Sequence, residues 1–188
     1  MSDHERNRVF ALEGLDGVGK TTVGKLLAEQ TGGQYLYFMD HNKMKPFRQR
    51  FDGAPTPIRF LYYLTATIDA YFQAEKLKQS SDVFVDRTVA SLIAYHRAYS
   101  LSERWFWLIP HKLVSQIDTM IYFTMSEENR IARLQSRPLT IGDKSSLLLA
   151  NKIEYEYHKL FSNNTVRVIV DQKNPEEIVT EIKGAIYG

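Results

Sequence analysis

Five short runs of mostly apolar residues recur along the chain, and the segments between them carry apolar residues at helical spacing. The runs are Val9–Leu12, Gln34–Met39, Val83–Val85, Thr119–Phe123 and Val166–Val170. Continuous apolar runs that alternate with helices are typical of parallel strands buried on both faces. The pattern therefore predicts a five-stranded parallel sheet between two layers of helices, a three-layer α/β/α fold.

The helices are predicted from apolar spacing and from signals at their ends. The first follows the first strand and ends near Thr31, where two glycines stop it. A polar stretch from Asp40 to Thr56 predicts a loop with a short helix. Thr140–Ser146 is a polar segment, and a helix that ends at Phe161 is expected after it. The other helical segments are expected over Ile58–Gln79, Val89–Tyr99 and Glu103–Gln116, from Ser126 to Arg137, and from Asn174 onward.

Composition narrows the class of protein. The 188 residues, 44% of them hydrophobic, predict one domain over residues 1–188. A net charge of +2, with basic residues spread out, gives no reason to expect a nucleic-acid partner. The absence of cysteine excludes disulfides and thiolate metal sites. Because the N-terminus is polar and no apolar run reaches the roughly 20 residues of a membrane span, we expect no membrane contact and a cytoplasmic protein.

The segment between the first strand and the first helix fits the pattern G-x-x-x-x-G-K-[ST]. In such a loop successive backbone N–H groups surround phosphate oxygens, and glycines permit bends that a Cβ would block. The lysine can reach the β- and γ-phosphates of ATP, and the hydroxyl that follows it can hold Mg²⁺. The motif therefore predicts a P-loop NTPase fold and a nucleotide-phosphate site; the residues are Gly14, Leu15, Asp16, Gly17, Val18, Gly19, Lys20, Thr21 and then Thr22.

Further polar residues follow the predicted strands at the same edge of the sheet, where ligands of parallel sheets bind. Asp40 follows the second strand, and Asp86 and Arg87 follow the third. Thr124 ends the fourth strand where an acidic residue would be expected, so Asp86 is predicted to hold the metal together with Thr21. Asp86 and Arg87 can also be interpreted as an ordinary ion pair at a strand end.

Two motifs together resemble the thymidylate kinase family of nucleoside monophosphate kinases. One is the phosphate loop with an acidic residue, Asp16, inside it. The other is Asp86-Arg87 followed by Val89-Ala90-Ser91-Leu92-Ile93-Ala94-Tyr95, which is similar to the family's Asp-Arg motif and Ser-x-x-Ala-Tyr helix. A weaker match is the series Arg130, Arg133 and Arg137 before a polar segment, which resembles the family's lid around residues 137–150.

The resemblance implies a role for each matched residue. The loop residues 14 and 16–22 bind ATP with Mg²⁺, Asp86 lies near the metal, and Arg87 clamps the acceptor phosphate. Asp16 faces the acceptor, and Arg133 and Arg137 bring positive charge from the lid. We therefore expect ATP-dependent phosphoryl transfer to a (deoxy)nucleoside monophosphate, in which Lys20, Asp16, Asp86, Arg87 and Arg133 take part. The resemblance also implies a homodimer, with residues 105–109 interpreted either as interface or as core.

The acceptor half departs from the family. Asp40 lies where the family carries an Arg-Glu-Pro-Gly-Gly-like segment, with Arg48 just beyond it, and Asp69 aligns with an arginine that helps hold the base and phosphate. The residues expected around the acceptor are thus Asp16, Asp40, Arg48, Asp69 and Arg87.

Two alternatives remain open. Asp40 and Asp69 suit a kinase acting on the hydroxyl of a nucleoside or another small metabolite, because a hydroxyl acceptor needs a general base. Arg48 and Arg87 suit a monophosphate instead. The missing acid after the fourth strand leaves room for a nucleotide-binding switch protein. In an interpretation without a functional role, Asp16 only forms a turn, and the arginines near residue 133 only form a solvated helix face.

Overall fold

The computed structural model of the chain describes residues 6–39 and 47–188. Its five strands form one sheet in the order β2-β3-β1-β4-β5, and every neighbouring pair is parallel. The predicted five-stranded parallel sheet is confirmed, with each strand within two residues of its expected bounds. The strands are β1 (Val9–Glu13), β2 (Gln34–Tyr37), β3 (Val83–Asp86), β4 (Thr119–Thr124) and β5 (Thr165–Ile169).

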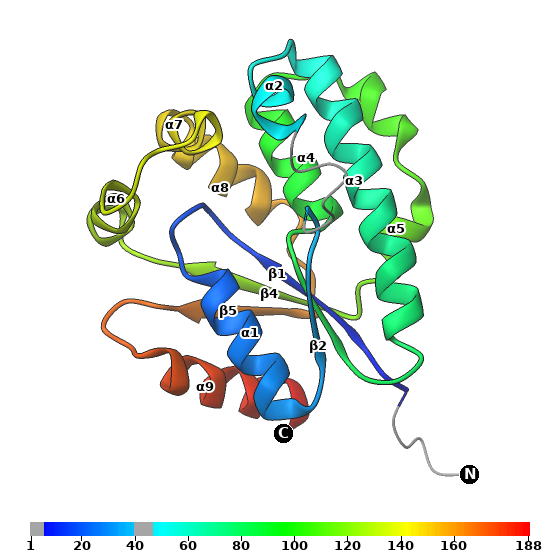
Figure 1. Cartoon of the computed structure of the whole chain (residues 1–188), viewed down its shortest axis with the longest axis vertical. Coiled ribbons are helices and arrows are strands. Elements are labelled where there is room, and N and C mark those ends of the chain that lie inside the picture. The colour runs from blue at the N-terminus through cyan, green and yellow to red at the C-terminus, as the bar shows by residue number, and fades with distance from the viewer. Residues whose placement is uncertain (1–5, 40–46) are drawn as a thin grey trace.

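Helices cover both faces of the sheet (Figure 1). On one face α1 (Lys20–Thr31) and α9 (Pro175–Tyr187) pack against each other. On the other lie α3 (Thr56–Leu77), α4 (Val89–Ala98) and α8 (Ala150–His158). The shorter helices are α2 (Arg48–Asp52), the 3₁₀-helix Glu103–Leu108, α5 (His111–Ser115), α6 (Glu127–Gln135) and α7 (Ile141–Leu148).

Strand β3 shows why a strand inside this sheet is apolar. Successive side chains of a strand point to opposite faces of a sheet. Val83 and Val85 pack in one cluster with alanines of α3, whereas Phe84 stacks on Phe10 at 5.0 Å between ring centroids in a second cluster. Because both faces are covered, each position of the strand has to be apolar until the chain reaches Asp86 at its carboxyl end.

Two helical regions differ from the sequence prediction. The expected helix over Glu103–Gln116 is divided, because Pro110 separates the 3₁₀-helix from α5. The 3₁₀-helix leaves Trp107 89% exposed. The polar segment near residue 140 is itself helical, since Thr140 and Asp143 form a capping box that starts α7.

Other end signals act as predicted. The side chain of Asn174 accepts a hydrogen bond from the N–H of Glu177 at 2.9 Å, and this capping box starts α9 with Pro175 in its first turn.

Among the described residues, no helix is both long and apolar enough to cross a membrane.

Two helical glycines offer opposite tests of the packing. A Cβ on Gly24 in α1 would lie 2.4 Å from Cδ1 of Leu12, whereas a Cβ on Gly184 in α9 would have no described atom within 4 Å. We expect Gly24→Ala to lower the free energy of unfolding by about 1–3 kcal/mol, because the core must shift. We expect Gly184→Ala to raise it by about 0.5–1 kcal/mol through helix propensity. Urea unfolding followed by circular dichroism measures both, and equal effects would contradict the packing of α1.

Candidate active site

The loop between β1 and α1 has a backbone that its glycines make possible. Gly14, Gly17 and Gly19 have φ angles of 135°, 91° and 91°. A Cβ on Gly14 would lie 2.5 Å from the carbonyl oxygen of Phe123, so glycine is required there. Gly19 is also the N-cap of α1, and the N-terminus of a helix favours anions. The loop therefore has the shape that phosphate binding requires.

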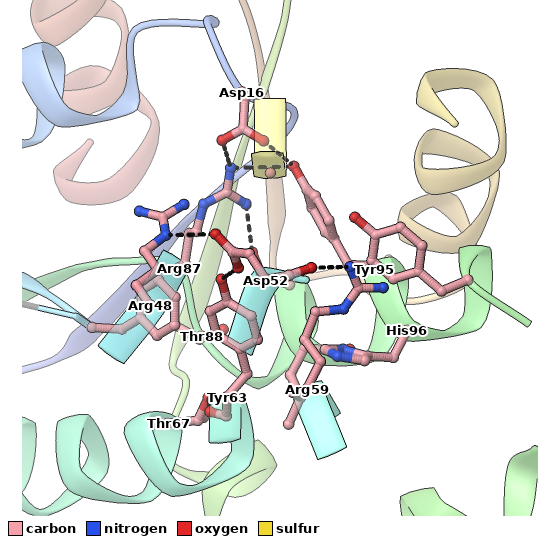
Figure 2. A pocket seen from close by; sticks show the side chains of 15 residues that line it. Asp16, Arg48, Asp52, Arg59, Tyr63, Thr67, Arg87, Thr88, Tyr95 and His96 are labelled. Carbon is pink, nitrogen blue, oxygen red and sulfur yellow. Dashed lines mark hydrogen bonds and ion pairs between the residues drawn. The ribbon is translucent and has the colours of Figure 1, made fainter. Parts of the chain in front are cut away.

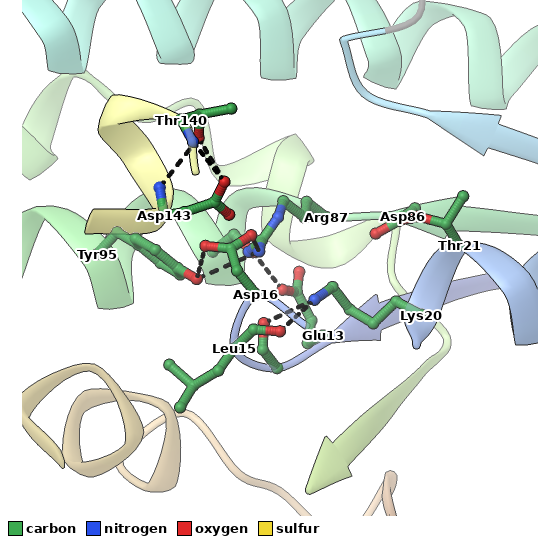
Figure 3. Close-up of polar contacts among 12 residues, drawn as sticks. Glu13, Leu15, Asp16, Lys20, Thr21, Asp86, Arg87, Tyr95, Thr140 and Asp143 are labelled. Carbon is green, nitrogen blue, oxygen red and sulfur yellow. Dashed lines mark hydrogen bonds and ion pairs between the residues drawn. The ribbon is translucent and has the colours of Figure 1, made fainter. Parts of the chain in front are cut away.

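Lys20 lies beneath this loop and is 6% exposed. Its Nζ donates hydrogen bonds to the carbonyl oxygens of Gly14 at 3.0 Å and Leu15 at 2.7 Å (Figure 3). Burial and then the charge of Arg87 lower the pKa of Lys20 to about 8, although Asp86 and other carboxylates oppose the shift. The ammonium group is thus held by hydrogen bonds to the loop that would surround a phosphate.

Thr21 and Asp86 meet where α1 begins and β3 ends. Oγ1 of Thr21 donates to Oδ2 of Asp86 at 2.6 Å, and the hydroxyl of Tyr35 donates to the same oxygen at 2.8 Å. Among the described residues no three histidine or acidic side chains gather into a metal cage. A hydroxyl beside one carboxylate fits Mg²⁺, which keeps several waters and binds phosphate oxygens in nucleotide sites.

Arg87 connects the phosphate loop to the rest of the site. Its φ of 71° is uncommon for a residue with a side chain, and such strained positions gather at functional sites. Its Nη2 donates to Oδ1 of Asp16 at 2.5 Å and to the hydroxyl of Tyr95 at 3.2 Å, and its Nη1 donates to Ser91 at 3.1 Å. The hydroxyl of Tyr95 donates in turn to Oδ2 of Asp16 at 3.1 Å.

This network determines the charge of Asp16. Burial acts to raise the pKa of its carboxyl, but the positive charges of Arg87 and Lys20 outweigh burial and hold that pKa well below its usual range. Asp16 is therefore a carboxylate at neutral pH and a weak proton acceptor.

Two cavities meet at this ion pair. The larger has a volume of about 540 Å³ and extends along the phosphate loop. The smaller, about 70 Å³, lies between α3 and α4 (Figure 2). Asp16, Arg48 and Arg87 line both. One ligand over the loop and a second against the helices would thus meet at the same three charged side chains.

Most residues predicted from the sequence lie in this region. The carbonyl oxygen of Gly14 accepts a hydrogen bond from Lys20, and the side chain of Val18 is buried. Asp40 lies outside the described residues. The predicted residues that line the larger cavity are Asp16, Gly17, Gly19, Lys20, Thr21, Thr22, Arg48, Asp86, Arg87, Arg133 and Arg137.

Asp69 lines neither of the two cavities. It is exposed on α3, where Nε2 of Gln73 donates to its Oδ2 at 2.8 Å. Thr67, two residues earlier, lines the smaller cavity. Two residues of an α-helix correspond to a rotation of about 200°, so Asp69 points away from the cavity that Thr67 faces.

The three arginines near α6 have separate environments. Arg133 lines the larger cavity, whereas Arg130 is 1% exposed and does not belong to a solvated face. Arg137 donates from Nη1 and Nη2 to both oxygens of Asp143, each at 2.9 Å. Because Asp143 also closes the capping box with Thr140, one carboxylate starts α7 and orients Arg137.

Several lining residues of the smaller cavity were not found from the sequence. Arg59, Tyr63 and Thr67 come from one face of α3, and their spacing of four residues is the signal that would have indicated it. The hydroxyl of Tyr63 donates to Oδ1 of Asp52, whose Oδ2 lies 3.5 Å from Nε of Arg48. His96 completes this group from α4.

Comparisons with known proteins agree with this geometry. A family model described as "Thymidylate kinase" matches residues 12–182. A "Probable thymidylate kinase" of Sulfolobus acidocaldarius is 27% identical over 95% of this chain and 96% of that protein. One of Methanococcus vannielii is 28% identical over 94% of this chain and 93% of the relative. The structure of thymidylate kinase from Candida albicans superposes with a TM-score of 0.76 over 97% of this chain and 92% of the other, at 17% identity, which supports the fold.

Asp143 gives a test of the coupling between α7 and Arg137. We expect Asp143→Ala to speed amide hydrogen exchange in α7 about tenfold, because the helix loses its cap and an ion-pair partner. Asp171→Ala is the matched control, since Asp171 accepts hydrogen bonds from Ser126 and Asn129 at α6. Exchange measured by mass spectrometry should rise in α7 only for Asp143→Ala, and the same exchange in both variants would contradict this role.

Proposed function

Because this chain belongs to the thymidylate kinase family of ATP-dependent nucleotide kinases, we propose that it transfers the γ-phosphoryl group of ATP to a nucleoside monophosphate of the thymidylate type. The observation that carries the proposal is the pair of cavities that meet at Asp16, Arg48 and Arg87. Phosphoryl transfer is catalysed mainly by alignment of the two reactants and by positive charge around the transferred group. Two cavities with cations at their junction suit that requirement.

In this proposal the larger cavity takes ATP. Backbone N–H groups of residues 17–22 bind its phosphates, and Lys20 exchanges its two carbonyl partners for β- and γ-phosphate oxygens. Arg133 and Arg137 add positive charge from the lid side. Thr21 and Asp86 would hold Mg²⁺, which when bound neutralises charge on the phosphates.

The smaller cavity takes the acceptor. Arg87 can bind a phosphate in two-pronged fashion, with Arg48 beside it. Asp16 keeps the guanidinium of Arg87 in place and stays ionised. A phosphate acceptor attacks through an oxygen that is already anionic, so it needs no general base.

The carboxylates of this cavity favour a phosphate over a hydroxyl acceptor. Among the described lining residues they are Asp16, paired with Arg87 and Tyr95, and Asp52, which interacts with Arg48 and Tyr63. Both already have cationic and hydroxyl partners, and neither is free to take a proton from a hydroxyl group.

The direct test is release of ADP from Mg-ATP with a panel of nucleoside monophosphates and their parent nucleosides. We expect turnover with dTMP and none with thymidine. Turnover with nucleosides alone would replace the proposal with a hydroxyl kinase, and nucleotide binding without acceptor-dependent turnover would indicate a switch protein.

Arg87 and Arg133 should affect different substrates. We expect Arg87→Ala to lower kcat/KM for dTMP more than tenfold while the Kd for ATP changes less than threefold, because this side chain serves the acceptor. Arg133→Ala should instead raise the Kd for ATP. Arg97→Ala is the control, since Arg97 pairs with Glu103 away from both cavities. Steady-state kinetics and ATP titrations separate these effects, and equal loss of ATP binding in Arg87→Ala would assign Arg87 to the donor.

A further inference from the structure

The carboxylate of Asp86 receives two hydroxyl groups on the same oxygen. Oγ1 of Thr21 donates to Oδ2 at 2.6 Å, as the positions of the two residues in Figure 3 illustrate, and the hydroxyl of Tyr35 donates to Oδ2 at 2.8 Å. The other oxygen, Oδ1, has no hydrogen-bond partner among the described residues. Asp86 is 1% exposed and lines the larger cavity, so a group that enters this cavity is the partner that Oδ1 can still gain.

Tyr35 reaches Asp86 because of the register between β2 and β3. The strands are parallel, and Tyr37 lies opposite Asp86. Tyr35 is two residues earlier in β2, so its side chain points to the same face of the sheet, and its hydroxyl has to extend about 6.6 Å along the strand. The length of a tyrosine side chain matches this distance. The hydroxyl of Tyr37 has a different partner, since it accepts a hydrogen bond from Nη1 of Arg48 at 3.2 Å.

Packing against α1 fixes the ring of Tyr35. A Cβ on Gly24 would lie 2.9 Å from Cε2 and 3.0 Å from Cδ2 of this ring, so the helix has a glycine where the tyrosine passes. Nζ of Lys25 lies 5.8 Å from the ring centroid. The ring is half-buried in these contacts, and they determine where its hydroxyl lies before any ligand binds.

The hydroxyl of Tyr35 is a donor to Asp86 at any pH at which the protein works. Burial and then the negative charge of Asp86 raise the pKa of this hydroxyl well above its usual range. It therefore keeps its proton, which a carboxylate oxygen can only accept. The hydroxyl of Thr21 has a second role in the proposed function, because its oxygen also binds Mg²⁺. Tyr35 is thus the donor whose contact with Oδ2 does not compete with the metal.

We propose that Tyr35 is a positioning residue for the metal: its hydroxyl holds Oδ2 of Asp86 and so leaves Oδ1 to Mg²⁺ or to a water bound to it. The inference rests on the proposed function, in which Thr21 and Asp86 hold the metal. A partner that orients a metal-binding side chain contributes about 10–100-fold to metal affinity. Tyr35 acts through Asp86 in this role.

One atom separates the informative variant from the unsubstituted protein. Tyr35→Phe removes the hydroxyl and keeps the ring that packs on α1. Tyr37→Phe is the matched control, because it removes a hydroxyl from the same face of β2 and from the same cavity, but one that contacts Arg48 and not Asp86.

Two measurements report on the metal without turnover. The first is the Kd for ATP, determined by equilibrium titration in Mg²⁺ and again in EDTA. The second is the Kd for Mn²⁺ in the presence of a non-hydrolysable ATP analogue, determined by electron paramagnetic resonance, since Mn²⁺ takes the same oxygen ligands as Mg²⁺. The melting temperature of each variant is recorded beside them.

We expect Tyr35→Phe to raise the Kd for Mn²⁺ about tenfold and to lower the ratio of the ATP Kd in EDTA to that in Mg²⁺ by a similar factor. The ATP Kd in EDTA should change less than twofold, and Tyr37→Phe should leave the Kd for Mn²⁺ within twofold. Unchanged metal binding in Tyr35→Phe overturns the proposal, and so does equal weakening in the two variants. Failure of Tyr35→Phe to fold assigns the hydroxyl to stability and overturns it as well.

These outcomes are separate from those that test the proposed function. If the unsubstituted protein binds ATP more tightly in Mg²⁺ but phosphorylates no monophosphate, the proposed function fails, and Tyr35→Phe still decides the role of Tyr35. If the unsubstituted protein binds ATP equally in Mg²⁺ and in EDTA and takes up no Mn²⁺, there is no metal for Asp86 to hold, and the inference about Tyr35 is wrong.

Discussion

The ion pair between Arg87 and Asp16 is the contact on which the arrangement of the site depends. It joins the phosphate loop after β1 to the carboxyl end of β3, and Tyr95 and Ser91 of α4 hold its two sides. Both side chains are largely withdrawn from water, so removal of either would leave an unpaired charge in a poorly solvated place. The pair therefore fixes the positions of the phosphate loop, the carboxyl end of β3 and α4 relative to one another. The two cavities meet at this pair.

The parts of the site that the sequence predicted are those whose chemistry is local in the chain. The phosphate loop depends on glycines at fixed intervals, and Arg87 follows directly on a buried strand. The residues of the smaller cavity depend instead on how α3 faces α4. That packing is not readable from spacing in one segment, and alignment by residue type selected Asp69, which lies on the wrong side of the helix for a cavity residue. The start of α7 was missed for another reason, because its capping pair was interpreted as part of a polar segment before the helix.

The polar side chains of the smaller cavity differ in whether they already have hydrogen-bond partners. Its two described carboxylates interact with arginine and tyrosine, whereas Nε2 of His96 and the Nε atoms of Arg48 and Arg59 have no hydrogen-bond partner among the described residues. Groups that are satisfied before a ligand arrives hold shape, and groups that are not satisfied gain a hydrogen bond when it binds.

Asp143 carries a further consequence. Since the same carboxylate caps α7 and binds Arg137, the folding of that helix and the freedom of that arginine are thermodynamically linked. An anion that draws Arg137 away from Asp143 weakens the start of α7. By reciprocity, loosening α7 strengthens the hold of Arg137 on the anion. Loosening of this segment and binding of an anion by Arg137 are thus two sides of a single equilibrium, and its position is set by competition for one guanidinium group.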